Sequence, residues 1–167
     1  MGVAGSGKST VAAALADLLG LEMIEGDALH PAANVEKMRR GVPLTDEDRQ
    51  PWLASLAGLL ADRHAHGRGT VLACSALRRA YRDVLRAAVP PDETFIVELA
   101  ADATTLRARM VHRPGHFMPV DLLGSQLATL EDIGGGEVGV VIDAGAPLDV
   151  VVSQAITAID AWVASKR

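Results

Sequence analysis

The sequence predicts an α/β domain in which helices cover both faces of a parallel sheet. Three observations support this fold class. Short apolar runs rich in β-branched residues alternate with helical patterns, a glycine-rich loop opens the chain directly before a helical pattern, and no linker or repeat interrupts the alternation. The chain of 167 residues has the length of one domain, which we place at residues 1–167.

The expected elements follow from the period of their apolar residues. Strands are short continuous apolar runs, whereas helices carry apolar residues at three- and four-residue spacing. Gly20 ends the first helix, because glycine favours the left-handed conformation found there, and Thr45 with Asp48 forms a capping box at the start of the third. In chain order the expected elements are helix 8–20, strand 21–27, helix 30–41, helix 45–67, strand 70–76, helix 77–88, strand 94–100, helix 102–113, helix 119–132, strand 139–144 and helix 147–165.

Composition and charge exclude several classes of protein. The formal net charge of -5 at pH 7 argues against non-specific nucleic-acid binding, which needs a basic surface. No apolar run reaches the length of a membrane-spanning helix, and no signal sequence opens the chain. Cys74 is the only cysteine, which suits a reducing compartment. We therefore expect a cytoplasmic protein that binds neither nucleic acid nor a membrane.

The opening segment MGVAGSGKST contains a complete phosphate-loop motif. The fixed positions of G-x-x-x-x-G-K-[ST] are occupied by Gly2, Gly7, Lys8 and Ser9. In such a loop, backbone N–H groups cradle phosphate at the start of the next helix, the lysine reaches the β- and γ-oxygens, and the serine hydroxyl ligates Mg²⁺. The N-K-x-D motif by which switch GTPases recognise guanine is absent. A motor-type ATPase needs an acid at the end of a second core strand, and Asp143 lies too late in the chain for that role, so we expect it to end the last strand.

A second group of polar residues follows the first expected strand. Asp27 stands at the carboxyl end of that strand, where open α/β sheets bind their ligands. A carboxylate there can accept a proton from an attacking hydroxyl or hold metal-bound water, although a role as helix N-cap is the open alternative. His30 is either a substrate contact or a structural histidine. The charged run from Asp46 to Arg49 taken alone is typical of a solvated helix face.

Five segments together resemble those of gluconokinases of the small phosphate-loop type. They are GVAGSGKST, GDALHP, NVEKMRRGVPLTDEDRQPWL, CSALRRAYRD and GHFMPVDLLGSQLATLE, running from Gly2 to about Glu131. The first is shared by many proteins, whereas the other four in this order are specific. The resemblance implies ATP-dependent phosphorylation of D-gluconate at its 6-hydroxyl, which gives 6-phosphogluconate and ADP. It also implies ATP as cosubstrate and Mg²⁺ as metal, and it leaves a homodimer open.

The same resemblance implies a three-layer P-loop kinase fold related to shikimate and nucleoside monophosphate kinases. Its five-stranded parallel sheet has the order 2-3-1-4-5, and a lid is expected at about residues 112–120. The first, central strand precedes the phosphate loop, and this chain begins at that loop. Five buried Val, Ile or Leu side chains of such a strand contribute roughly 10 kcal/mol, comparable to the whole stability of a domain, about 5–15 kcal/mol. We therefore expect Met1 to be an internal methionine and the natural chain to extend upstream by roughly 5–10 residues.

Residue roles are implied by the matching motifs. ATP is expected at Gly5, Ser6, Gly7, Lys8, Ser9 and Thr10, with Ser9 also on Mg²⁺. The substrate is expected at Asp27, His30, Arg49, Arg82 and His116, with weaker candidates at Lys37 and Arg78. Catalysis is expected from Lys8, Asp27, Arg109 and Arg113. In this scheme Asp27 is the general base or a carboxylate on the metal side. The two lid arginines share a helix face and clamp the phosphoryl group, unless they are ordinary surface arginines.

Two other functions compete with this interpretation. A kinase for shikimate, another small molecule or a nucleoside monophosphate would share the phosphate loop, but GDALHP and DRQPWL argue against it. A nucleotide-binding protein without turnover would follow if the central strand were truly absent. Retention of Lys8, Ser9 and Asp27 argues against such a loss of activity.

Overall fold

The computed structural model describes residues 1–111 and 119–167, so Arg113, His116 and most of the predicted lid lie outside the described residues. The strands are β1 (Glu22–Glu25), β2 (Thr70–Ala73), β3 (Ile96–Ala100) and β4 (Gly139–Asp143). The α-helices are α1 (Lys8–Leu19), α2 (Ala32–Arg39), α3 (Asp46–Ala65), α4 (Arg79–Arg86), α5 (Ala103–Val111), α6 (Leu122–Thr129) and α7 (Leu148–Ala164). Two short 3₁₀ helices are η1 (Gly26–Leu29) and η2 (Pro91–Glu93). The expected strands and helices are thus confirmed, with ends that differ by a few residues.

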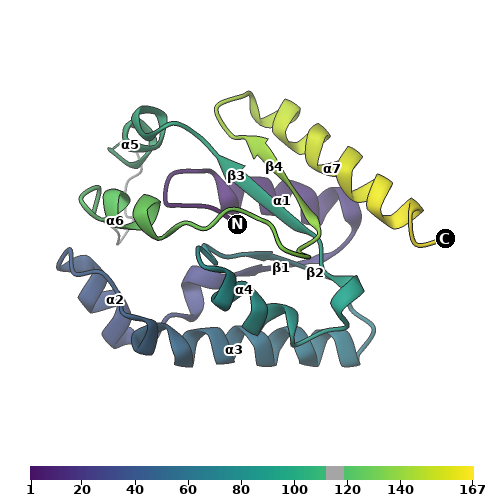
Figure 1. The fold of residues 1–167 in the computed structure, drawn as a ribbon, viewed down its shortest axis with the longest axis horizontal. Coiled ribbons are helices and arrows are strands. Elements are labelled where there is room, and N and C mark those ends of the chain that lie inside the picture. Colours follow the sequence, from purple (N-terminus) through teal and green to yellow (C-terminus); the bar gives the residue numbers. More distant parts are fainter. Residues whose placement is uncertain (112–118) are drawn as a thin grey trace.

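The elements form three layers, with the strands in the middle (Figure 1). Helices α3 and α4 cover one face, where Trp52 and Leu56 pack with Ile24 of β1. Helices α1 and α7 cover the other face, where Leu15 packs with Ile142 of β4. The predicted α/β architecture with helices on both faces is therefore confirmed. Within the described residues, no helix is long and apolar enough to cross a membrane.

In the part of the chain that the structure describes, the strands form two parallel pairs. β1 pairs with β2 with Ile24 opposite Leu72, and β3 pairs with β4 with Leu99 opposite Ile142. These pairs correspond to the neighbours 2-3 and 4-5 of the predicted order. The five-stranded order itself is not confirmed, because no described strand lies between β2 and β3.

Met1 and Gly2 lie between the two pairs of strands. The Met1 amino group donates to the Val97 carbonyl of β3. The Leu99 N–H donates to the Met1 carbonyl at 3.0 Å, and the Gly2 N–H donates to the Ser75 carbonyl, just after β2, at 3.3 Å. A pocket of about 370 Å³ continues from Met1 between the pairs. Its apolar lining includes Val11, Leu15, Val71, Leu72, Phe95 and Ile96.

The predicted helix-end signals are present. Gly20 has φ of 65° and follows α1, as a residue in the left-handed conformation does. At the start of α3, Thr45 Oγ1 accepts from Asp48 N–H at 3.3 Å, and the Asp48 carboxylate accepts from Thr45 N–H at 2.7 Å. This capping box fixes where α3 begins and therefore where the adjacent Arg49 projects.

Candidate active site

The phosphate loop is a tight turn that ends in helix α1. Gly5 and Gly7 have φ of 81° and 90°, a conformation that L side chains rarely adopt. A Cβ at Gly5 would lie 2.8 Å from the Leu106 carbonyl oxygen of α5, so the loop packs closely against that helix. A Cβ at Gly7 would meet nothing within 4 Å. The loop is thus packed on one side and open at the start of α1, where a phosphate can approach the backbone.

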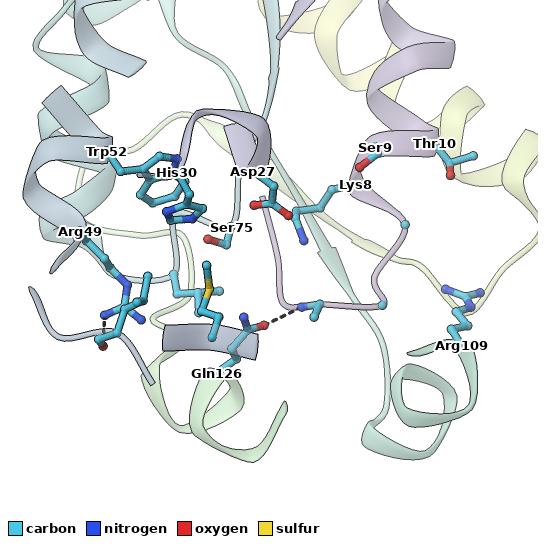
Figure 2. A pocket seen from close by; sticks show the side chains of 16 residues that line it. Lys8, Ser9, Thr10, Asp27, His30, Arg49, Trp52, Ser75, Arg109 and Gln126 are labelled. Atoms are coloured by element: carbon cyan, nitrogen blue, oxygen red, sulfur yellow. Dashed lines mark hydrogen bonds between the residues drawn. The ribbon is translucent and has the colours of Figure 1, made fainter. Parts of the chain in front are cut away.

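The open side of the loop faces a pocket of about 400 Å³ (Figure 2). The loop and α1 form one wall, η1 and α3 a second, and α5 and α6 a third. The predicted site residues that line it are Gly5, Gly7, Lys8, Ser9, Thr10, Asp27, His30, Arg49 and Arg109. Segments far apart in the sequence are therefore brought to one cavity.

Lys8 and Asp27 come to this cavity from neighbouring elements. Lys8 is the first residue of α1, and its Nζ donates to the Val3 carbonyl at 3.0 Å. Asp27 lies in η1, directly after the carboxyl end of β1, as predicted. It is not the N-cap of the following helix, because Pro31 occupies that position in α2. A cation and a carboxylate thus share the cavity with the phosphate loop.

His30 is held in the cavity by Trp52. Their rings are stacked with centroids 4.1 Å apart and an angle of 15° between the planes. Trp52 is fixed in turn, because its indole N–H donates to the Gly26 carbonyl at 2.7 Å. Burial lowers the pKa of His30 to about 4; the Asp27 carboxylate opposes this shift and the Arg49 charge adds to it. His30 is therefore a neutral imidazole at pH 7, and its buried Nδ1 has no hydrogen-bond partner among the described residues.

Arg49 projects from the first turn of α3 into the cavity, and contacts with Leu44 and Tyr81 orient its side chain. Its guanidinium donates to the Leu44 carbonyl at 2.6 Å and lies 5.4 Å from the centre of the Tyr81 ring. The Tyr81 hydroxyl donates to the Asp46 carboxylate. Arg78 donates to the same carboxylate at 2.6 Å. Arg78 therefore belongs to the network that supports Arg49, and it does not line the cavity.

The structure does not bring every predicted residue to the cavity. Arg82 is 2% exposed and forms a buried ion pair with Glu137 at 2.6 Å, so its guanidinium is turned away from the proposed substrate. Lys37 pairs with Asp48 at the start of α3. Ser6, within the phosphate loop, is buried and does not line the cavity. Arg113 and His116 belong to the residues that the structure does not describe.

Comparison with known proteins places this arrangement in a family. A protein-family model described as an AAA domain matches residues 1–133. The gluconokinase of Gluconobacter oxydans is 49% identical over 156 residues, covering 93% of this chain and 86% of that protein. The chain belongs to the gluconokinase family.

Solved structures agree with this family assignment. A gluconokinase from Sinorhizobium meliloti is similar with a TM-score of 0.85 and 48% identity, over 96% of this chain and 89% of that one. A sugar kinase from Janibacter sp. in its unliganded form is similar with a TM-score of 0.90 and 49% identity, over 96% of this chain and 91% of that one. The P-loop kinase fold implied by the sequence motifs is therefore confirmed.

Some residues that line the cavity of this gluconokinase-family chain were not predicted as site residues, and among them Trp52, Ser75 and Gln126 have side chains that can form hydrogen bonds. Trp52 had a usable signal, because it stands three positions after Arg49 on a helix and therefore shares its face. Ser75 follows β2, at the same strand edge as Asp27. Gln126 lies within GHFMPVDLLGSQLATLE, one of the segments that resemble gluconokinases, but no pattern in that segment places its side chain at the phosphate loop, which its helix reaches only through the tertiary fold.

Proposed function

We propose that this protein transfers the γ-phosphoryl group of ATP to the 6-hydroxyl of D-gluconate, giving 6-phosphogluconate and ADP. The observation that carries the proposal is that one cavity joins the phosphate loop to Asp27, His30 and Arg49. Those three residues come from the segments that are specific to gluconokinases. Relatives that carry the name gluconokinase at 41–49% identity support the same activity.

The phosphate-loop side of the cavity binds ATP in this proposal. The N–H groups at the start of α1 bind the β-phosphate, aided by the positive end of a helix of 12 residues. Lys8 exchanges its bond to the Val3 carbonyl for the β- and γ-oxygens of the nucleotide. Arg109 of α5 lines the same cavity and adds positive charge where the transferred group carries negative charge.

Side chains from two neighbouring walls of the cavity fit Mg²⁺. This ion prefers oxygen ligands and is usually held by one or two protein groups together with substrate phosphates. The Ser9 hydroxyl and the Asp27 carboxylate are oxygen donors that line one cavity. When bound, the ion neutralises charge on the β- and γ-phosphates.

The opposite side of the cavity binds gluconate. The oxygen of the 6-hydroxyl bonds to the γ-phosphorus as the bond from that phosphorus to the ADP oxygen breaks, and the hydroxyl proton passes to the Asp27 carboxylate. Neutral His30 supplies a hydrogen bond to a substrate hydroxyl through its unpaired Nδ1. The Arg49 guanidinium pairs with the carboxylate at the other end of the substrate. Gluconate is thus oriented with one end at the phosphate and the other at α3.

An assay of ADP release with Mg-ATP and a panel of acceptors tests the proposal. Gluconate-dependent ADP release, with shikimate and AMP inactive, is the expected result. Turnover of shikimate or AMP in preference to gluconate would show that the protein is a related kinase that phosphorylates a different acceptor. ATP binding without turnover of any acceptor would indicate a nucleotide-binding protein and would refute the proposed activity.

We further propose that the sheet has five strands in the order 2-3-1-4-5, with the central strand directly before Met1. Met1 exchanges hydrogen bonds with Val97 and Leu99 of β3, as a residue in a parallel strand does. Gly2 bonds to Ser75 on the β2 side. The apolar pocket of about 370 Å³ that continues from Met1 has the surroundings of a buried strand.

Lengthening the chain tests this second proposal. Adding roughly 5–10 residues translated in frame from the DNA directly upstream of Met1 is expected to raise the melting temperature. It is also expected to reduce the binding of a hydrophobic dye, because the added strand covers the apolar pocket. An unchanged melting temperature together with unchanged dye binding would contradict the five-stranded order.

A further inference from the structure

A side chain of helix α6 forms a hydrogen bond with the backbone of the phosphate loop. Gln126 accepts a hydrogen bond from the Ala4 N–H through its Oε1 at 2.6 Å, and Figure 2 shows this bond at the edge of the cavity. The two residues are 122 positions apart in the sequence. The bond therefore depends on the tertiary fold and not on the phosphate-loop motif itself.

The Ala4 N–H belongs to the peptide group between Val3 and Ala4, and the carbonyl of that same group faces Lys8. The Val3 carbonyl and the Ala4 N–H belong to the same planar unit, so the direction of one fixes the direction of the other. The Val3 carbonyl accepts from Lys8 Nζ at 3.0 Å and from the Ser6 N–H at 3.3 Å. The bond to Gln126 thus sets the orientation of the carbonyl on which the Lys8 ammonium rests.

Packing does not replace this bond. Val3 and Ala4 are 3% and 5% exposed, and their side chains pack with Leu106 and Leu123. Rotation of the peptide plane between them leaves both side chains where they are, so apolar contacts alone do not select its direction. A buried N–H that loses its acceptor is costly, and the peptide then turns toward another acceptor or water.

We propose that Gln126 is a positioning residue for the phosphate loop, which orients the Val3–Ala4 peptide and, through it, Lys8 for binding nucleotide phosphates. This inference rests on the proposed function only in that the loop binds a nucleoside phosphate. Gln126 does not itself transfer a proton or a phosphoryl group. Its effect is on the geometry of the site before the nucleotide arrives.

Substitution of Gln126 by methionine tests the inference. Methionine keeps an unbranched side chain of similar length but offers only a weak acceptor. The dissociation constant for Mg-ADP is expected to rise about 3- to 10-fold, the effect of one lost hydrogen bond. The KM for ATP rises with it, whereas the KM for gluconate stays unchanged. Gln154→Met is the matched control, because Gln154 is exposed on α7.

Amide hydrogen exchange of the nucleotide-free protein supplies a readout that does not depend on activity. The Ala4 N–H is expected to exchange faster in Gln126→Met than in the wild type and in Gln154→Met. Unchanged Mg-ADP affinity, or an equal loss for Mg-ADP and gluconate with a lower melting temperature, overturns the inference. If the wild type itself fails to bind Mg-ADP, the proposed function fails instead, and Ala4 exchange still decides whether Gln126 holds the loop.

Discussion

Trp52 and His30 form a stacked pair in which the buried imidazole is neutral. The rings lie 4.1 Å apart, and the indole N–H is tied to the Gly26 carbonyl at 2.7 Å, so the stack connects α3 to the segment that carries Asp27. Burial in this position lowers the pKa of His30 to about 4. A neutral ring beside the Asp27 carboxylate does not form a fixed ion pair with it. The carboxylate therefore stays available to a substrate hydroxyl or a metal-bound water.

The depressed pKa of His30 predicts how stability depends on pH. The pKa falls from 6.5 in the unfolded chain to about 4 in the folded protein, so between these two values the unfolded state takes up the proton and the folded state does not. The contribution of His30 to stability is complete above 6.5 and is lost as the pH falls toward 4. Relative to His30→Asn, the wild type should lose on the order of 1–2 kcal/mol over this interval, because solvent screens a partly exposed group.

Urea unfolding of both proteins at several pH values measures this difference. The asparagine variant lacks the titrating ring, and the other ionisable groups are common to both chains. Parallel curves of unfolding free energy against pH for the two proteins would show that the folded-state pKa of His30 is not depressed.

Replacement of Asp27 by asparagine is expected to lower kcat by about 10²–10⁴-fold, the range for loss of a general base. Stability should change little, because the side chain is not a helix cap. Asp17→Asn, on the exposed side of α1, is the matched control. Kinetics over a range of Mg²⁺ concentrations distinguish the two roles. A kcat that stays low at saturating Mg²⁺ indicates a base, whereas recovery at high Mg²⁺ indicates a carboxylate on the metal side.

Replacement of Arg49 by methionine is expected to raise the KM for gluconate about 10- to 100-fold, which corresponds to loss of charge-assisted hydrogen bonds. The KM for ATP should stay within a factor of about two, because Arg49 lies on the α3 wall of the cavity. Arg40→Met provides the control, since Arg40 stands after α2 with its side chain 67% exposed. Equal changes in the KM for gluconate and the KM for ATP would mean that Arg49 does not bind gluconate specifically.

Much of the fold was predictable because its signals are local. The capping box of Thr45 and Asp48 and the glycine after α1 depend only on neighbouring residues, and both were read correctly. The grouping of Asp27 with the phosphate loop was also predictable, since the carboxyl ends of parallel strands meet at one edge of a sheet. The roles given to these residues stay predictions.

Contacts between segments far apart in the sequence could not be predicted from local patterns. Arg82 is separated by 55 positions from Glu137, and the bond between Gln126 and Ala4 spans 122. Nothing in the pattern around Arg82 distinguishes an arginine that faces a substrate from one that is buried against a turn. The difference lies in how α4 packs against the glycine-rich segment 134–136, which is a property of the folded chain.

The burial of Arg82 leads to a prediction opposite to the one its motif suggested. Its guanidinium bonds both carboxylate oxygens of Glu137, at 2.6 and 2.8 Å, and donates to the Glu131 carbonyl at 2.8 Å. Removing one member of such a buried pair leaves an uncompensated charge. Arg82→Met should therefore lower the free energy of unfolding by about 3–5 kcal/mol.

The kinetic constants of Arg82→Met decide between a structural role and substrate binding. Measured well below its melting temperature, the variant should keep the KM for gluconate and for ATP, because Arg82 does not line the cavity. Arg107→Met, on the exposed surface of α5, should change neither stability nor kinetics. Glu137→Gln should be destabilised in the same direction as Arg82→Met, since it leaves the guanidinium buried without its counterion. A raised KM for gluconate in Arg82→Met with normal stability would instead indicate that Arg82 binds gluconate, as its sequence motif suggested.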